Sequence, residues 1–217
     1  RTDRARMGGM AQLSAMAADE RRDLADFLET LTDEEWERPS LCPGWSVRDV
    51  AGHVPSYDML GWPAFLAMFA RSGFSLDRCN RTRIEQVRGT PTTELVERLR
   101  TYAVPRGITS MFGSAIALTD AVIHHQDIRR ALGRPREVPP ERLLAALEFL
   151  PRARGAAIAA EPARSPGDRD RPGLVQRRGP EVRGPGEALV VAFAGRPAAL
   201  DELEGSGLDT LAARVRG

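Results

Sequence analysis

The sequence predicts a mainly α protein, with a helical bundle followed by a small α/β or α+β lobe. Three observations carry this prediction. Through the first 154 residues, apolar side chains recur at three- and four-residue steps, the spacing of a buried helix face. Over residues 155–186, glycine, proline and arginine dominate and this periodicity vanishes; apolar residues then return. We therefore expect a bundle over residues 1–154, a linker over 155–186 and a small lobe over 187–217.

The composition is that of an ordinary globular protein. The chain has 217 residues, of which 42% are hydrophobic, enough for a sizeable core. Its 31 basic and 30 acidic residues give a net charge of +1, which excludes the strongly basic balance of many nucleic-acid-binding proteins. Every basic residue is arginine, which favours a GC-rich source genome such as an actinobacterial one. The two cysteines match no zinc or redox spacing, which indicates reduced thiols.

No segment is typical of a membrane or secreted protein. No apolar run approaches the ~20 residues that a membrane-spanning helix needs, and no signal-peptide pattern is visible. We therefore expect a cytoplasmic protein. The arginines between Arg164 and Arg183 alternate with a few acids and lack interleaved aromatic side chains, so a linker is favoured there over a phosphate or RNA site.

The first predicted helix runs from Met10 to Leu31, because its apolar residues recur with helical spacing. Thr32 then starts a short second helix, with a hydroxyl that can cap it and three acids that suit the positive end of the helix dipole. Residues 39–45 hold two prolines and a glycine, which predicts a fixed loop.

Ser46 predicts the start of the next helix, with Asp49 three residues on as the partner of a capping box. His53 lies at the edge of the apolar face of this helix. Pro55 lacks an amide donor, so the helix should kink or break just after His53. Beyond it we expect helix from Trp62 to about Ala70, and then loop as far as Arg88.

Three further helices follow in the bundle. Thr92 or Thr93 caps one that reaches Tyr102. A long helix is expected over residues 108–132, with Gly133 as its stop. The last opens at residues 139–141 and carries a leucine-rich face to Leu150.

Three side chains on these helices predict a metal site. Asp120 and His124 are four residues apart, so a carboxylate and an imidazole lie one turn apart on the same side of the long helix. His53 adds a third ligand from a neighbouring helix. Three protein ligands leave a position for water or substrate, as in catalytic rather than structural zinc sites. Asp127, further along the same stripe, is placed to orient a ligand imidazole.

Simpler interpretations of these residues remain open. An Asp and a His at this spacing also occur by chance, and a histidine at a core edge is often just hydrogen-bonded. His125 points about 100° away from His124 and is the poorer ligand. Cys42 has no basic partner in its own loop, so a buried structural thiol is favoured over a nucleophile.

Several stretches resemble the mycothiol-dependent maleylpyruvate isomerase family, a branch of the DinB-like metal-binding bundles. Its first signature is similar to LTDEEW at 31–36 and PSLCPGWSVRDVAGHV at 39–54, and its second to DAVIHHQDIRRALG at 120–133. The small C-terminal lobe of the family is similar to GPEVRGP at 179–185, GRPAAL at 195–200 and LEGSGL at 203–208. The resemblance implies an up-and-down four-helix bundle with a small C-terminal α/β lobe.

The resemblance also implies a site and a chemistry. A divalent metal, usually zinc, would be held by His53, Asp120 and His124, and would activate the low-molecular-weight thiol mycothiol. The reaction would be isomerisation of a small electrophile or transfer of the thiol to it, by a monomer or homodimer. The family more often has glutamate where this chain has Asp120, which leaves open a deeper ion, a water-bridged one or weaker binding. Pro55 close to His53 is expected to shift that ligand.

Other assignments stay open at this stage. For a dianionic substrate, Arg129 and Arg130 are candidate anion donors, although both also suit a helix C-terminus. The same site could instead perform hydrolysis, with Asp127 or Asp58 as the proton acceptor. A non-catalytic bundle that lost its metal and serves as a dimerising or binding module is the remaining alternative.

Overall fold

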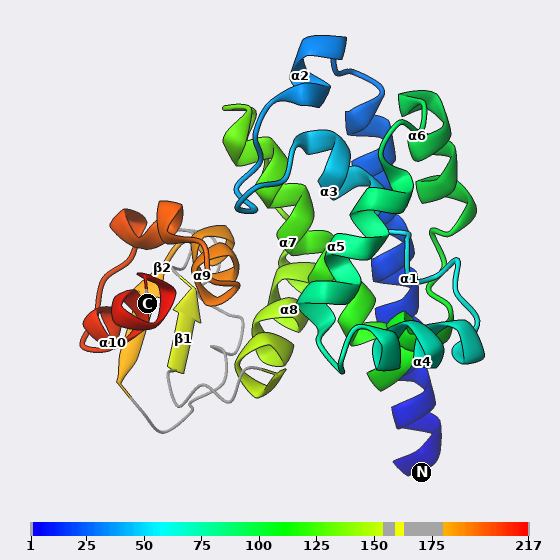
Figure 1. Cartoon of the computed structure of the whole chain (residues 1–217). Coiled ribbons are helices and arrows are strands. Elements are labelled where there is room, and N and C mark those ends of the chain that lie inside the picture. The colour runs from blue at the N-terminus through cyan, green and yellow to red at the C-terminus, as the bar shows by residue number, and fades with distance from the viewer. Residues whose placement is uncertain (1, 154–158, 163–179, 217) are drawn as a thin grey trace. The chain divides into compact units, whose positions relative to one another are not determined.

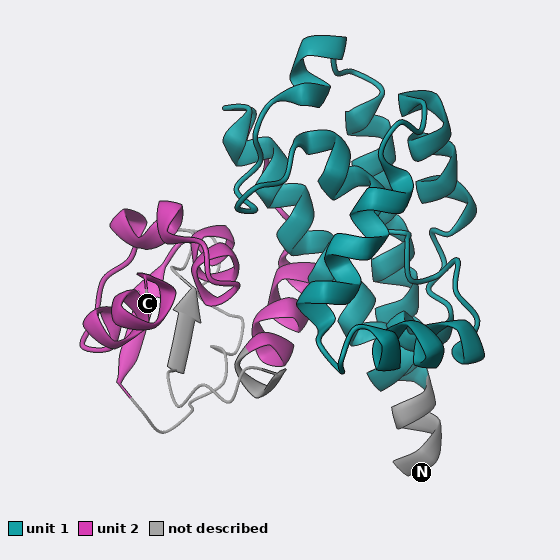
Figure 2. Cartoon of the chain, viewed as in Figure 1, with its two compact units in different colours: residues 1–134 teal, residues 135–217 magenta. Residues whose placement is uncertain are grey.

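The computed structural model describes residues 2–153, 159–162 and 180–216. Its fold is mainly α, as predicted (Figure 1). The chain divides into two compact units, residues 1–134 and residues 135–217 (Figure 2). Each unit is described by itself below. In the described part of the chain, every helix is too short or too polar to cross a membrane.

Unit 1 is a helical bundle. Its elements are α1 Thr2–Leu28, α2 Asp33–Glu37, α3 Val47–His53, α4 Trp62–Arg71, α5 Leu76–Val87, α6 Thr92–Thr101, the 3₁₀ segment η1 Gly107–Ser114 and α7 Ala115–Ala131. The long helix α1 packs against α6, η1 and α7, and α3 packs against α5, α6 and α7. The core between them is built from fully buried side chains that include Leu24, Leu28, Val47, Val50, Ala51, Leu95, Leu99, Ala121 and Ile128. Burying each large aliphatic side chain stabilises the fold by about 2 kcal/mol.

The predicted helix starts around the first signature are confirmed. Thr32 and Glu35 form a capping box at α2, in which each side chain accepts a hydrogen bond from the other's backbone N–H. Ser46 and Asp49 form a second box at α3. The α3 helix ends at His53, just before Pro55, as the proline predicts.

Two predicted elements are wrong. Residues 76–87 form the helix α5, not a loop, and the pattern was hard to recognise because few apolar residues, Cys79, Ile84 and Val87 among them, line its buried face. The long helix begins at Ala115, not near Ile108. The backbone takes left-handed conformations at Phe112, Gly113 and Ser114, with φ values of 55°, 68° and 72°, and no α-helix continues through such residues.

Unit 2 holds α8 Pro140–Ala153, the strands β1 Ala159–Pro162 and β2 Glu181–Gly184, α9 Gly186–Phe193, the 3₁₀ segment η2 Pro197–Glu202 and α10 Leu208–Arg216. The two strands are parallel, with Ala159 opposite Glu181. The α9 helix packs against α8, η2, α10 and both strands. Its residues 188–192 are fully buried, so this helix is the core of the unit.

The division of the chain differs from the expected one. The predicted boundary at residue 154 falls inside unit 2, so α8 groups with the C-terminal lobe and not with the bundle. The stretch predicted as a linker contributes β1 and β2, and α9 already begins at Gly186. Short strands of four residues carry little periodicity, which is why composition alone suggested a linker. Residues 163–179 of that stretch lie outside the described residues.

Candidate metal centre

Two helices bring the three predicted ligand residues together. His53 is the last residue of α3, and Asp120 and His124 lie one turn apart on α7. Asp120 Oδ1 is 3.3 Å from His124 Nε2 and 3.8 Å from His53 Nε2. One ligand atom from each residue lies within 4.8 Å of the other two. Residues 67 positions apart in the sequence (53 and 120) therefore meet in one cluster.

The cluster has the dimensions of a site for a small divalent ion. Metal–ligand bonds of about 2.1 Å at tetrahedral angles place neighbouring ligand atoms about 3.4 Å apart. Asp120 Oδ1 lies 3.3 and 3.8 Å from the two histidine nitrogens, just below and just above that separation. Aspartate, although shorter than glutamate, therefore reaches both histidines. The Asp120 side chain is 33% exposed, against 7% for His53 and 10% for His124. Small molecules can therefore approach from the Asp120 side.

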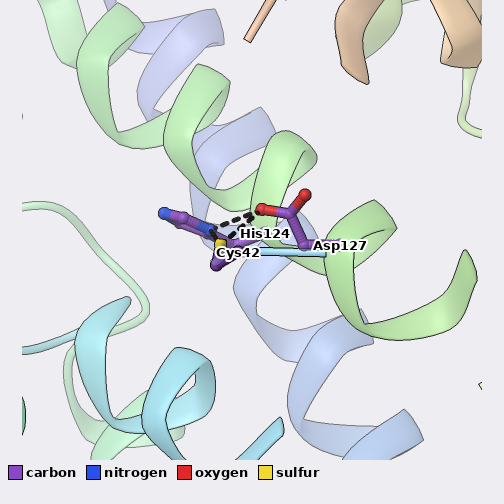
Figure 3. A group of neighbouring side chains, drawn as sticks. All are labelled: Cys42, His124 and Asp127. Atoms are coloured by element: carbon purple, nitrogen blue, oxygen red, sulfur yellow. Dashed lines mark hydrogen bonds and ion pairs between the residues drawn. The ribbon is translucent and has the colours of Figure 1, made fainter. Parts of the chain in front are cut away.

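The two ring nitrogens of His124 face different groups. Its Nε2 faces Asp120, whereas its Nδ1 lies 3.0 Å from Asp127 Oδ2. Asp127 is fully buried and also accepts a hydrogen bond from the Cys42 thiol, at 3.0 Å (Figure 3). A carboxylate can only accept, so Asp127 keeps a proton on Nδ1, and when the ring is neutral its Nε2 lone pair is left for a metal. Asp127 thus contacts the imidazole that its spacing suggests it would orient.

Cys42, His124 and Asp127 also lie close enough together to hold an ion. Hydrogen bonds account for this group, however, because the thiol and the imidazole both donate to one carboxylate oxygen. The Cys42 sulfur lies 3.6 Å from His124 Nδ1. The Cys42 loop itself has no basic side chain near the thiol, and His124 of α7 supplies one. The two residues are 82 positions apart in the sequence, so only folding brings them together.

Backbone hydrogen bonds hold the Cys42 loop against α7. The N–H of Leu41 donates to the main-chain carbonyl of Asp127 at 3.1 Å. The Ser40 hydroxyl accepts from the Cys42 N–H and donates to the carbonyl of Trp45. Gly44, with φ of 77°, supplies the tight turn. The loop predicted from its prolines is therefore the segment that brings a thiol and an indole to the cluster.

Charges and burial set the protonation of the cluster. Burial lowers the pKa of His53, so this ring is neutral near pH 7. Burial alone would also lower the pKa of His124, but the Asp120 and Asp127 carboxylates hold it well above its usual value. Burial would raise the pKa of Asp120, but the two histidines outweigh it and hold that pKa well below its usual value. Without a metal, the cluster is an Asp120–His124 ion pair beside a neutral His53.

Aromatic side chains wall the cluster. The Trp45 ring lies 5.0 Å from the His53 ring and stacks on His124 at 6.3 Å, between ring centres. Tyr57 meets His53 edge-on at 5.9 Å, and its hydroxyl donates to Asn80 Oδ1 at 2.6 Å. Burial raises the pKa of Tyr57 well above its usual value, so its hydroxyl stays protonated.

The comparisons with known proteins agree with the resemblance. Residues 17–107 match the family described as the mycothiol maleylpyruvate isomerase N-terminal domain. The match covers 91 of the 217 residues, in the N-terminal part of the chain. The matched segment includes His53 and the Cys42 loop, and it ends before Asp120. A comparison with curated proteins finds no match.

Two solved structures are similar to this chain. One is the mycothiol-dependent maleylpyruvate isomerase, at 15% identity, and the other is a histidine-to-alanine mutant of that enzyme, at 13% identity. Each similarity covers 92% of this chain and 92% of the solved one, with a TM-score of 0.47.

The other residues singled out in the sequence have structural partners. His125 is fully buried, with its Nδ1 2.9 Å from Glu20 Oε1 and its Nε2 accepting from Arg129 at 3.0 Å. Arg129 also lies over the Phe27 ring, 3.9 Å from its centre. It is thus part of the packing between α1 and α7, and Arg130, beside it near the end of α7, is half-buried.

Asp58 is also occupied by structural contacts. Its carboxylate forms a buried ion pair with Arg21 at 2.9 Å and accepts hydrogen bonds from the Arg106 N–H and the Thr109 hydroxyl. This network ties α1 to the segments before α4 and at η1.

Sequence reasoning missed two residues near the cluster and one contact. Tyr57 and Arg83 carried no signal, because Tyr57 follows the break after His53 and Arg83 lies in the helix predicted as loop. The contact of Cys42 with Asp127 was also missed. A helical-face test on residues 76–87, with Cys79, Arg83 and Ile84 on one side, could have placed Arg83 toward the bundle.

Proposed function

We propose that His53, Asp120 and His124 hold a divalent metal, most simply zinc, and that the protein uses it to activate mycothiol in an isomerase or transferase reaction. One observation carries this proposal: three ligand atoms from two helices converge at metal-like separations, with one side accessible to small molecules. The match of residues 17–107 to the mycothiol maleylpyruvate isomerase N-terminal domain supports the choice of thiol.

The protein's own residues would prepare the site for this chemistry. Asp127 holds His124 with its Nε2 directed at the ligand position, and Cys42 holds Asp127. The neutral His53 offers a lone pair without first losing a proton. Asp120 adds the single negative charge among the three ligands. A bound divalent ion would favour the thiolate form of the cosubstrate over the thiol, which supplies a nucleophile at neutral pH.

The thiolate would attack a small electrophile, and two outcomes share this first step. If the thiol leaves again after rotation about the attacked bond, the result is isomerisation of the substrate. If the thiol stays attached, the result is transfer. The rings of Trp45 and Tyr57 pack on His53 and would cover this side of the cluster in either case.

The hydrolase alternative is less well supported by the contacts. Of its two candidate proton acceptors, Asp58 is engaged with Arg21, Arg106 and Thr109. Asp127 is held by His124 and Cys42 and is fully buried. Neither carboxylate is placed to take a proton from a water molecule.

Elemental analysis of protein purified without an affinity tag tests the metal. We expect close to one zinc per chain, and close to none in His53→Ala. Arg22→Ala, which changes an exposed ion pair on α1, serves as the matched control and should keep its zinc. If His53→Ala retains as much metal as the parent, the cluster is not the site.

A cobalt-substituted sample tests the thiol. Adding mycothiol should produce a thiolate-to-metal charge-transfer band, and the apparent pKa of the thiol should fall on binding. An unchanged spectrum together with hydrolysis of activated esters would replace the proposal by the hydrolase. An unchanged spectrum without hydrolysis would leave the binding module.

A further inference from the structure

Exposed apolar side chains are concentrated in three stretches of unit 1. Among the described residues, the large hydrophobic side chains that stay exposed lie near the start of α1, in residues 59–76 around α4, and in residues 104–112, which include most of η1. They are Met10, Met59, Trp62, Leu66, Phe74, Leu76, Val104, Met111 and Phe112. Single exposed hydrophobic residues are ordinary, but a concentration of them marks a surface that another molecule covers.

The three stretches meet in the folded unit. A Cβ atom at Gly113 would lie 2.7 Å from Cγ of Met10, so η1 packs closely on α1 at this point. A Cβ atom at Gly107 would lie 3.3 Å from the carbonyl oxygen of Leu60, so the start of η1 lies against the segment that leads into α4. In Figure 1, α4 lies toward the end of the unit that holds the start of α1. The nine side chains therefore form one surface, which we call the apolar end.

The helix α4 is apolar on its exposed side as well as on its buried side. Its ten residues hold a single charged side chain, Arg71, at the last position. Phe65 is buried on the inner side. An exposed stripe at four-residue steps is formed by Trp62, Leu66 and Ala70. A helix that is apolar all round is normally buried, so the exposed stripe requires an apolar partner.

Two phenylalanines project from this surface in a strained backbone conformation. Phe74 is 73% exposed and Phe112 is 68% exposed. Both residues adopt left-handed backbone angles, with φ values of 57° and 55°. This conformation is rare for a bulky residue and costs about 1–3 kcal/mol at each position. The fold keeps this strain and leaves both rings exposed, which indicates that the rings contact something outside the chain.

The charges beside the apolar end favour an anionic partner. Arg71, Arg78 and Arg106 are exposed and border it, and no described carboxylate forms an ion pair with them. Both α4 and η1 lack acidic residues, and the exposed acids of α5 are Asp77 and Glu85. Two copies packed face to face here would bring like charges together, whereas an anionic surface would attract them. Tryptophan, phenylalanine and leucine beside arginine are typical of proteins that lie on a membrane surface.

We propose that the apolar end docks on the surface of a bilayer that contains anionic phospholipids. The exposed rings and leucines enter the interfacial layer, and the arginines beside them meet the headgroup phosphates. This is contact by one face of unit 1 and not a crossing of the bilayer. The inference does not rest on the proposed function, because no part of it needs the metal or the thiol.

Co-sedimentation of the full chain with lipid vesicles tests the inference. Vesicles of equal parts phosphatidylcholine and phosphatidylglycerol should bind the protein at least about tenfold more tightly than vesicles of phosphatidylcholine alone. High salt should remove this difference, because it screens the arginines. The double variant Trp62→Ser/Leu66→Ser should bind the mixed vesicles at least about tenfold more weakly, since it has lost apolar area that enters the interface. No binding to the mixed vesicles, or equal binding to both kinds, would overturn the proposal.

A matched pair of charge variants locates the contact. Arg71→Gln/Arg106→Gln should weaken binding to the mixed vesicles about tenfold, because two arginines no longer meet the headgroups. Arg22→Gln/Arg98→Gln makes the same change in net charge at ion pairs within α1 and α6, and should bind like the parent. Equal losses in the two double variants would show that net charge drives binding, and would reject the docking site.

Two further measurements decide the outcome even if a double variant fails to fold. Brominated phospholipid should quench the tryptophan fluorescence of the parent protein. Trp62→Phe stays apolar, so it should still bind but lose most of the quenching, because Trp62 is the exposed tryptophan. Quenching that survives in Trp62→Phe would place another face on the bilayer and reject the proposal. In sedimentation equilibrium without lipid, a dimer that Trp62→Phe weakens, together with no vesicle binding, would replace the bilayer by a second copy of this chain.

Discussion

His124 and His125 are neighbours on α7, but their ring nitrogens have different partners. His125 is fully buried and sits between Glu20 and Arg129, so both of its ring nitrogens have protein partners. His124 has a protein partner for Nδ1, but its Nε2 faces Asp120 and His53, at the side of the cluster that solvent reaches.

The contrast shows that partners, and not residue type, decide what a buried histidine does. The Arg129 guanidinium can only donate, so His125 Nε2 is already used as an acceptor and has no lone pair left for a metal. The Asp127 carboxylate can only accept, so it keeps a proton on Nδ1 of His124, and Nε2 can bind a metal once it loses its own proton. One histidine holds α1 to α7, and the other turns a ring nitrogen toward Asp120.

Replacing each histidine by glutamine should separate the two roles. The largest effect that we predict is the loss of metal in His124→Gln. His124→Gln should lose nearly all zinc and change the free energy of unfolding of metal-free protein little. His125→Gln should keep its zinc but be less stable by about 1–3 kcal/mol, because a buried hydrogen-bond network is broken. Elemental analysis and urea unfolding of metal-free samples measure both. Loss of zinc in both variants, or in neither, would contradict the contrast.

Asp120→Asn should have the next largest effect. The change removes the negative charge of the ligand but keeps the size of the side chain. We expect zinc affinity to fall roughly 100-fold or more, a larger loss than is typical for residues that only hydrogen-bond to the ligands. Competition with a chelator of known affinity measures the zinc affinity. Asp120→Glu, the residue more common in the family, is the matched control and should bind zinc as tightly as the parent or more tightly. Equal affinities of Asp120→Asn and the parent would remove Asp120 from the ligand set.

Asp127→Asn should weaken zinc binding less, by about 10–100-fold, because it changes the orientation of His124 and leaves all three ligands in place. Cys42→Ala removes one donor to the same carboxylate and should have a smaller effect in the same direction. The same chelator competition orders the variants. A larger loss in Cys42→Ala than in Asp120→Asn would indicate that the ion binds at Cys42, His124 and Asp127 instead.

The pH dependence of metal binding should reveal a single proton. His53 and Asp120 are already deprotonated near pH 7, because the pKa of each is lowered, whereas the raised pKa of His124 keeps its ring protonated. Zinc must displace the Nε2 proton, so uptake releases about one proton and affinity rises about tenfold per pH unit until the pKa of His124 is passed. Calorimetry in buffers of different ionisation enthalpy counts the protons. Release of none would show that His124 is neutral before the metal arrives.

Much of this protein follows from short-range patterns in its sequence. The capping boxes at Thr32 and Ser46 and the end of α3 at His53 depend on hydrogen bonds and steric clashes among residues at most four apart. The i, i+4 spacing of Asp120 and His124 likewise follows from helix geometry alone. These features were predictable because each requires only local chain geometry, and their agreement with the family's signatures made the ligand set a sharp hypothesis.

The rest was decided by packing between distant segments. Whether His53 reaches Asp120 depends on how α3 lies against α7, and whether Cys42 or Arg83 belongs to the site depends on contacts of a loop and of α5. The contrast between His124 and His125 also depends on packing between distant segments, because the partner Glu20 of His125 comes from α1. Sequence by itself determined which side chains could bind a metal. Only the tertiary structure decided which of their atoms have protein partners, because those partners come from helices that meet only in the folded chain.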